Sequence, residues 1–233
     1  MCCATAVNFL LHSPVERHRC GQTSQPRKKC DSGIDLSAEL KRQSVEKINL
    51  KLYEWYFLLG LFLYTVGQFL IFIFFNDIDA LHSQEPIDFA HWFLLIGVLL
   101  LIPQIGNFPK SKLNLVGTPI LVIGIGLMIG MCVLDFVFWS IKSPEFSSEV
   151  ANHLINTPAI WKPFMNFNGW FFNLGLLISS LSYFKNSRLG TILVLIGTLV
   201  IYIGSGSFNV LGYIVLTVGF YINFYRQPLS QNE

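Results

Sequence analysis

The chain has 233 residues, of which 52% are hydrophobic, 15% aromatic and only 13% charged. Soluble domains carry about a quarter charged residues, so this composition disfavours an ordinary soluble enzyme. Nine of the sixteen Lys and Arg residues precede Tyr53, which leaves seven for the rest of the chain. The net charge of +2 does not indicate a nucleic-acid partner, because the basic residues lie where membrane topology places them. The composition predicts a protein that lies mostly in the lipid bilayer.

Residues 1–34 carry no periodic apolar pattern, and we expect a disordered cytoplasmic tail with reduced thiols. The apolar stretch at residues 9–11 is too short for a secretory signal. A zinc site that includes His18 is disfavoured because the nearby cysteines are not paired at short spacing. Acylation of the first two cysteines is one alternative, and a stretch up to residue 44 that is not native to the protein is another. The cysteines concerned are Cys2, Cys3, Cys20 and Cys30.

Residues 35–52 have apolar side chains at helical spacing and basic side chains on the other faces. This pattern predicts a basic amphipathic lead-in helix at the inner membrane surface, which Asp35 or Ser37 could cap. A calmodulin-type target is the alternative interpretation. The apolar residues are Leu36, Leu40, Ile48 and Leu52, and the basic ones are Lys41, Arg42, Lys47 and Lys51.

Six segments are long and apolar enough to predict transmembrane helices, of which the fourth and fifth are short. They make an all-α integral membrane protein in which residues 53–137 and 170–225 each hold three spans. Residues 138–169 are predicted as an extracytoplasmic loop, and residues 226–233 as a cytoplasmic tail. The six predicted spans are residues 53–75, 89–105, 115–137, 170–184, 189–205 and 208–224.

The basic residues predict the direction of these spans. Alternate connecting segments, beginning with the N-terminal tail, carry 14 Lys and Arg residues, whereas the intervening segments carry 2. The positive-inside rule therefore places both termini in the cytoplasm, which requires an even number of spans. The sequence has no Asn-x-Ser/Thr glycosylation site, which favours a bacterial inner membrane.

The two halves of the chain resemble each other. WYFLLGLFL from Trp55 aligns with WFFNLGLLI from Trp170, and the later spans align in the same order. Because each half holds three spans, the alignment predicts a three-plus-three inverted repeat with its two-fold axis in the membrane plane. Small residues recur every seven positions, which predicts close helix packing rather than ligand loops. The aligned glycines are Gly60, Gly97, Gly117 and Gly124 in the first half, and Gly175, Gly197, Gly212 and Gly219 in the second.

No intramembrane catalytic constellation is found, so we expect no enzyme activity, no cofactor and no metal site. Ser205 and Ser207 lie in a Gly-Ser-Gly-Ser stretch of the kind seen in intramembrane serine proteases, but every histidine precedes it and a base on a later span is missing. Cys132 has no second cysteine on its helix, which disfavours thiol–disulfide chemistry.

Four polar residues are predicted at similar depth in the outer half of the spans: Gln68, His91, Asp135 and Asn173. If they converge, they line a pocket that is open to the outside and covered by residues 139–169. A carboxylate beside an imidazole favours the charged form of each, so we expect the pocket to respond to pH between about 6 and 8. Interfacial roles for Asp135 and His91 are the alternative. A second set of candidates near the midplane is Tyr64, Thr65, Ser179, Ser180 and Thr198, although hydroxyls in helices often bond their own backbone.

The absence of midplane charge disfavours a charged substrate. We therefore expect a small transporter or channel-like protein for an uncharged or weakly polar solute. The alternative is a non-catalytic membrane scaffold or accessory subunit that binds a partner protein. The expected partners are the lipid bilayer and either a second copy of the chain or another membrane protein, without nucleic acid.

Overall fold

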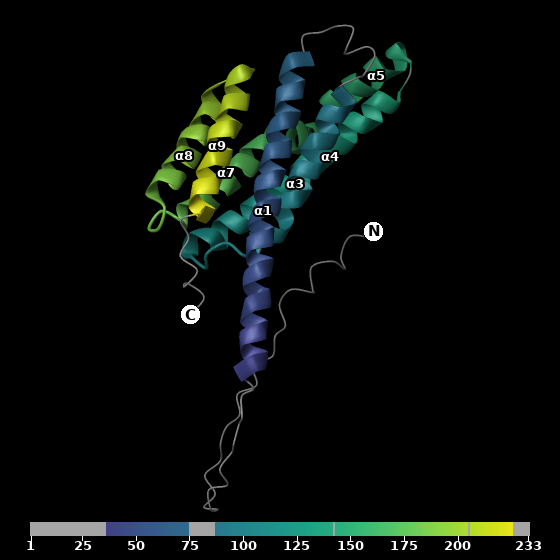
Figure 1. The fold of residues 1–233 in the computed structure, drawn as a ribbon. Helices are drawn as coiled ribbons and strands as arrows, with labels where there is room; N and C mark the ends of the chain where they lie inside the picture. The colour runs from purple at the N-terminus through teal and green to yellow at the C-terminus, as the bar shows by residue number, and fades with distance from the viewer. Residues whose placement is uncertain (1–35, 75–86, 142, 205, 226–233) are drawn as a thin grey trace, which may run out of the picture. The chain divides into compact units, whose positions relative to one another are not determined.

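Figure 1 shows the computed structural model of the chain, which describes residues 36–74, 87–141, 143–204 and 206–225. The chain divides into two units, Met1–Leu40 and Lys41–Glu233. Of the first unit, only residues 36–40 are described, and they begin a helix. All regular elements in the described ranges are helical, so the expected all-α class is confirmed for them. The expected tail at residues 1–34 lies outside the described residues.

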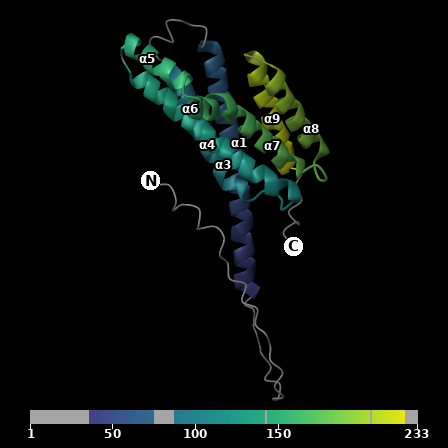
Figure 2. The same cartoon turned by 180° about the vertical axis from the view of Figure 1, so that it is seen from behind.

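Among the described residues, short turns join α3 to α4 and α7 to α8. Two short helices, α5 and α6, and a π-helical turn, η1, connect α4 to α7. Figures 1 and 2 show the helices of the second unit from opposite sides. Their bounds are α1 Leu36–Phe74, α3 Ile87–Ile105, α4 Lys112–Ser140, α5 Pro144–Ile155, α6 Pro158–Trp161, η1 Lys162–Phe167, α7 Asn168–Leu181, α8 Arg188–Ile203 and α9 Ser207–Tyr225.

Within the described residues, three helical segments are long and apolar enough to cross a membrane. They are Ile48–Phe74, Lys112–Ser140 and Ser207–Tyr225, with 27, 29 and 19 residues. Phe89–Ile105 and Arg188–Ile203 are shorter apolar helices. These lengths suggest a multi-pass membrane protein, because about 20 apolar residues span the hydrocarbon core.

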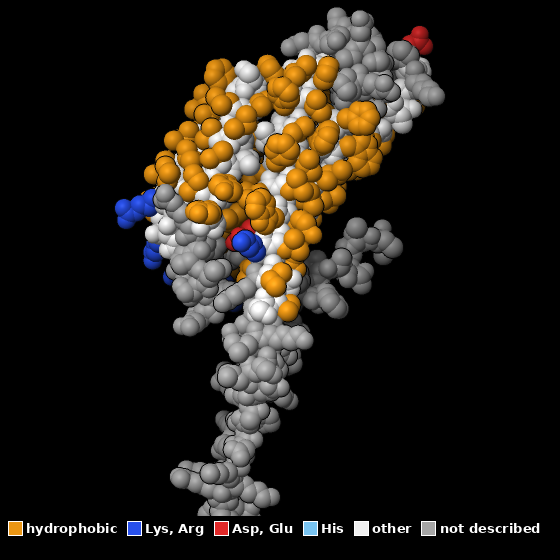
Figure 3. Space-filling view, viewed as in Figure 1, with side chains coloured by type: hydrophobic (Ala, Val, Ile, Leu, Met, Phe, Trp, Pro, Cys, Tyr) orange, Lys and Arg blue, Asp and Glu red, His pale blue; other side chains and the backbone are white. Residues whose placement is uncertain are grey.

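Large apolar side chains cover most of the described part of the face that Figure 3 shows. A soluble protein of this size would expose far more charge. A lipid-facing surface explains the pattern, since hydrocarbon solvates such side chains. Examples with exposed side chains are Phe62, Phe69, Ile96, Leu115, Val122, Leu199 and Leu211.

Three antiparallel helix pairs organise the second unit, and small residues lie where each pair is closest. In the pair α1–α3, a Cβ atom added to Gly60 would lie 2.6 Å from the Gly97 carbonyl oxygen. In the pair α8–α9, a Cβ added to Gly197 would lie 2.7 Å from the Gly212 carbonyl oxygen. Only a residue without a Cβ allows backbones to approach this closely.

The third pair, α4–α7, packs in the same way. A Cβ on Gly117 would lie 2.8 Å from a methyl carbon of Ile178, and one on Gly175 would lie 2.5 Å from the Leu121 backbone. Gly124 faces the Phe172 backbone. Each long apolar helix is therefore paired with a shorter one, α1 with α3, α4 with α7 and α9 with α8.

Connecting segments lie at two ends of the helix bundle. We call these the basic end and the loop end. The basic end holds the turns 106–111 and 182–187 with Lys110, Lys112, Lys185 and Arg188 beside them. The loop end holds α5, α6 and η1. There the Phe164 ring packs directly over Gly130 of α4, and this contact fixes η1 against the bundle.

An aromatic cluster fills the interior toward the basic end. Phe57 packs against Phe108, Phe220 and Phe224 with ring centroids 5.0–5.6 Å apart. Tyr183 lies 5.8 Å from Phe224 and joins the same cluster. Large buried rings of this kind supply most of the interior contact area.

The structure differs from the sequence prediction at the first span. A lead-in helix was expected at residues 35–52 and a separate span at 53–75, but the described residues of both, 36–74, form one uninterrupted helix, α1. Polar and apolar residues with good helix propensity run through the junction without Gly or Pro, so nothing ends the helix there. The loop expected at residues 138–169 is also largely helical, because Ser143 caps α5 and Pro158 begins α6.

Candidate polar site within the helix bundle

An acid–base pair joins α3 to α4 near the loop end. His91 Nε2 lies 2.9 Å from Asp135 Oδ2, and the two side chains are only 10% and 23% exposed. His91 lies on α3 and Asp135 on α4, and these helices are consecutive in the chain. They run antiparallel, as predicted from the short turn that joins them. A contact of this length is a charge-assisted hydrogen bond when the imidazole is protonated.

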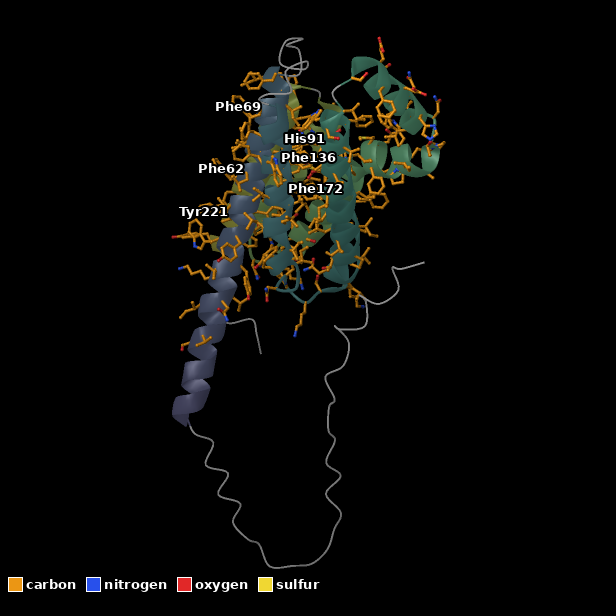
Figure 4. All side chains as sticks on the ribbon, turned by 90° about the vertical axis from the view of Figure 1, so that its right-hand side faces the viewer. Phe62, Phe69, His91, Phe136, Phe172 and Tyr221 are labelled. Carbon is orange, nitrogen blue, oxygen red and sulfur yellow. The ribbon has the colours of Figure 1, made fainter. Side chains whose placement is uncertain are left out.

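Aromatic rings surround this pair. The His91 and Trp139 rings lie edge to face with centroids 4.5 Å apart. Phe136 packs against both Trp92 and Trp139, at 4.9 and 5.8 Å. In Figure 4, His91 and Phe136 lie among the helices, whereas Phe62, Phe69 and Tyr221 project from the surface. The rings exclude water from one side of the pair and thereby strengthen its electrostatic attraction.

A second polar group lies at mid-height between α1, α7 and α9. Tyr64 and Tyr213 have hydroxyl oxygens 3.5 Å apart. Gln68 Nε2 donates to the Tyr64 hydroxyl at 3.4 Å, and Asn173 Nδ2 donates to the Tyr213 hydroxyl at 3.1 Å. We call these four residues the mid-height network.

The mid-height network is enclosed by the bundle. Tyr64, Tyr213 and Asn173 are at most 4% exposed. The Tyr64 hydroxyl also lies 3.9 Å from the Met128 sulfur of α4. Asn173 Oδ1 is buried without a hydrogen-bond partner, so the network has one unused acceptor. A buried polar atom without a partner costs free energy, and a bound molecule that donates a hydrogen bond to it would recover that cost.

The acid–base pair and the mid-height network are close in height. Gly67 faces the Ala90 backbone, so the residues that follow them, Gln68 and His91, lie at the same level. Cys132 is fully buried on α4, about one helical turn before Asp135. The four residues predicted as an outer pocket are thus divided between two adjacent groups rather than gathered in one.

The predicted midplane hydroxyls have different partners. Tyr64 belongs to the mid-height network. Thr65, Ser180 and Thr198 donate to backbone carbonyls of their own helices at 2.7–2.8 Å. Ser179 is fully buried and its hydroxyl has no partner. Three of the five hydroxyls are therefore used by their own helix backbone.

The glycines predicted for helix packing lie at helix contacts, but the contacts do not follow the alignment of the two halves. Gly60 faces α3, whereas its aligned position Gly175 faces α4. In the alignment α3 corresponds to α8 and not to α4. The contacts follow the three antiparallel pairs instead.

Several polar residues of the interior were missed by the sequence prediction. Tyr213 contacts both Tyr64 and Asn173 in the mid-height network. Its position directly after the packing residue Gly212 was the sequence signal that could have predicted an interior location. Three further residues near the basic end were also missed: Glu54, Gln104 and Tyr183. The sequence around them indicated only the ends of predicted spans. Polar side chains inside apolar spans deserve a functional interpretation wherever they lie.

Among the described residues, no group of three or more His, Cys, Asp or Glu side chains could hold a metal ion. The chain matched no protein-family model, no curated protein and no solved structure. Its function must therefore be argued from its own residues.

Proposed function

We propose that this protein is a small multi-pass membrane transporter or channel-like protein for an uncharged or weakly polar solute. The observation that carries the proposal is the mid-height network, with its unused acceptor at Asn173 Oδ1. Hydroxyl and carboxamide groups would offer such a solute both donors and acceptors. Polar groups are costly inside a bilayer, so a network with free hydrogen-bonding capacity favours a ligand-handling role.

The acid–base pair gives this transporter a charged gate at the loop end. Asp135 and His91 would meet the solute before the mid-height network does, and their attraction would hold α3 against α4. Coupling of transport to protons would then fall to this pair. The other described interior groups at this height, those of the mid-height network, are neutral. Such groups favour an uncharged solute.

We further propose that six helices cross the membrane. Each of the three long apolar helices is paired over small residues with a shorter one: α1 with α3, α4 with α7, and α9 with α8. A shorter helix held in register beside a spanning helix must lie at the same depth, so it would cross as well. The positive-inside count then favours cytoplasmic termini, and we propose a bacterial inner membrane.

The three-plus-three inverted repeat is an alternative way to organise these six helices. Its support is the sequence alignment, in which Gly60 corresponds to Gly175. The glycine contacts favour three hairpins instead, since these two positions face helices that do not correspond.

Transport by the purified protein in lipid vesicles tests the proposal. The probes are glycerol and urea, followed by stopped-flow light scattering, with an internal pH dye to record protons. We expect the protein to raise the permeability to at least one probe about tenfold above protein-free vesicles, and Tyr213→Phe to reduce that increase. Thr198→Val is the matched control, because its hydroxyl bonds only the Val194 carbonyl.

A scaffold is the second candidate, and the apolar surface of the connecting helices favours it. Phe146, Ile155 and Phe167 are 46–55% exposed between α4 and α7. A partner protein or a second copy of the chain could cover them. If the protein raises the permeability of the vesicles to neither glycerol nor urea, the transporter proposal is wrong and the scaffold proposal remains.

A further inference from the structure

A groove opens at the basic end, away from the proposed transport groups. Its volume is about 410 Å³, and it lies along the end of α3, the turn 106–111 and the first two turns of α4. Clefts of this size hold a small ligand or part of a larger one. We call it the basic-end groove.

Hydrogen bonds fix the walls of the basic-end groove. Asn114 Nδ2 donates to the Pro109 carbonyl at 2.6 Å and to the Ser182 hydroxyl at 3.1 Å. Ser111 Oγ accepts from the Asn114 backbone N–H at 3.1 Å. Phe108, in the turn itself, is buried against Phe57 of the aromatic cluster. The groove is therefore formed before any molecule binds, which lowers the entropic cost of binding.

The basic-end groove has a polar end and an apolar end. Lys110 and Ser111 line it in the turn, whereas Leu115 and Pro119 line it along α4. Ser111 and Pro119 are eight residues apart, which is about 12 Å along a helix. Leu115 is 78% exposed. Where α4 spans a bilayer, the polar end lies among the lipid headgroups and the apolar end beside the first carbons of the acyl chains.

The polar end of the basic-end groove is positively charged. Lys110 is exposed in the turn, and Lys112 is exposed in the first turn of α4. None of the described residues that line the groove is acidic, and the first turn of α4 holds no acidic residue. The free N–H groups of that turn add a partial positive charge. Shape and charge together fit an anionic group that is joined to an apolar chain.

One polar atom in the wall of the groove also indicates a bound molecule. Asn114 lines the groove and is 6% exposed, and its Oδ1 atom has no hydrogen-bond partner. In folded proteins nearly all such atoms are paired with protein, water or ligand. The wall of the groove therefore keeps hydrogen-bonding capacity that the protein itself does not use.

We propose that the basic-end groove binds an anionic phospholipid from the leaflet at that end. The Lys110 ammonium contacts the lipid phosphate, and one acyl chain lies along Leu115 and Pro119. A zwitterionic phospholipid binds more weakly, because it brings a second cation to a place that already holds two lysines. The bound lipid joins α3 to α4 through the turn 106–111. This site is separate from the mid-height network and does not depend on transport.

Lipid binding to the purified, full-length protein tests the site. The protein in detergent micelles is titrated with dioleoyl phosphatidylglycerol or with dioleoyl phosphatidylcholine, and native mass spectrometry gives the bound fraction. The two lipids have the same acyl chains and differ in the charge of the headgroup. We expect phosphatidylglycerol to bind about tenfold more tightly. Inorganic phosphate, added in competition, is the probe for a site that needs only the anion.

A charge variant locates the headgroup. Lys110→Gln should weaken the binding of phosphatidylglycerol about fivefold, the usual effect of one lysine near an anionic lipid. Lys185→Gln is the matched control, because Lys185 is exposed at the same end of the bundle but does not line the groove. The control variant should bind phosphatidylglycerol as the wild type does.

A pair of glycine variants locates the acyl chain. Gly106 lines the groove, and Gly126 lies on α4 outside it. A Cβ atom added at either position has no atom within 4 Å, so both positions accept a side chain. Gly106→Phe should weaken the binding of phosphatidylglycerol about fivefold by occupying the groove, whereas Gly126→Phe should not.

The outcomes decide the proposal. Equal binding of the two lipids to the wild-type protein overturns it, and this comparison needs no variant to fold. Equal losses in Lys110→Gln and Lys185→Gln also overturn it, because they indicate attraction to the whole basic end. Unchanged binding to a monodisperse Gly106→Phe variant shows that the lipid does not occupy the groove. Displacement of phosphatidylglycerol by an equal concentration of inorganic phosphate would assign the groove to a free anion and overturn the lipid site.

Discussion

Gly60 and Gly97 face each other across α1 and α3 so closely that neither can carry a side chain. A Cβ on Gly60 would lie 2.6 Å from the Gly97 carbonyl oxygen, and one on Gly97 would lie 2.8 Å from the Gly60 carbonyl oxygen. The contact joins the first long apolar helix to its shorter neighbour. Since apolar side chains gain little from leaving lipid, close backbone packing is what holds such helices together.

We predict that Gly60→Ala destabilises the protein by about 1–3 kcal/mol, the usual cost of overpacking. The added methyl group meets backbone, which cannot move aside as a flexible side chain would. Unfolding in mixed detergent micelles, followed by circular dichroism, measures the change in the free energy of unfolding.

Gly126→Ala is the matched control for this prediction. Gly126 is helical in α4, and a Cβ there would have no atom within 4 Å. Alanine has the higher helix propensity, so this variant should be as stable as the wild type or slightly more stable. A loss of stability at Gly126 equal to that at Gly60 would contradict the steric explanation.

The glycines also show how far the sequence could predict this fold. A seven-residue spacing indicates one helical face, so contact positions could be predicted from Gly60 and Gly67 alone. The partner of each face could not, because any glycine-bearing helix offers the same small surface. The observed contacts select the partner: Gly60 meets Gly97 of α3, and Gly175 meets Leu121 of α4.

We predict an energetic coupling between His91 and Asp135 of about 1 kcal/mol. The side chains touch at 2.9 Å, but the aspartate is 23% exposed, and partial solvation weakens the attraction. The free energies of unfolding of Asp135→Asn, His91→Asn and the double variant give the coupling as a double-mutant cycle. Additive effects of the two substitutions would show that the contact contributes nothing.

The same pair illustrates what could be predicted of the site. Its two members are the ionisable groups that the sequence places at similar depth on consecutive spans, and the turn between those spans brings them together. Gln68 and Asn173 were predicted beside them but bond to Tyr64 and Tyr213 instead. Depth along a helix follows from residue number, whereas the direction of a side chain around the bundle depends on all its neighbours.

Tyr213→Phe should destabilise the protein by about 1–3 kcal/mol, because the Asn173 carboxamide loses its bonded hydroxyl while remaining buried. Asn173→Leu in the Tyr213→Phe background should recover part of this loss, since no polar atom is then left unpaired. Thermal unfolding of the purified variants measures both effects. Thr65→Val is the control, because its hydroxyl bonds the Leu61 carbonyl and lies outside the network.

Phe164→Ala should loosen η1 and leave the bundle folded. The ring packs over Gly130 and is what holds the π-helical turn to α4, so its removal frees the segment without opening a helix pair. Hydrogen exchange of residues 158–167 should become faster, while the exchange of α8 and α9 should not change. Faster exchange throughout the protein would instead give Phe164 a role in global stability.

Single cysteines at positions 106 and 148 should react from opposite sides of the membrane. Gly106 is exposed in the turn at the basic end, with no atom within 4 Å of an added Cβ, and Ser148 is exposed on α5 at the loop end. Ser111 is less suitable than Gly106, because its hydroxyl accepts from the Asn114 backbone and caps α4. Lys110 and Lys185 lie in the two turns at the basic end, and Lys112 and Arg188 begin the helices that follow them; the positive-inside rule retains such segments in the cytoplasm. In intact cells of a strain expressing the chain without its native cysteines, a membrane-impermeant maleimide should therefore label the cysteine at 148 and spare the one at 106 until the membrane is permeabilised.

Labelling at 106 with protection at 148 would invert the orientation, and labelling of both would mean that α4 does not cross the bilayer.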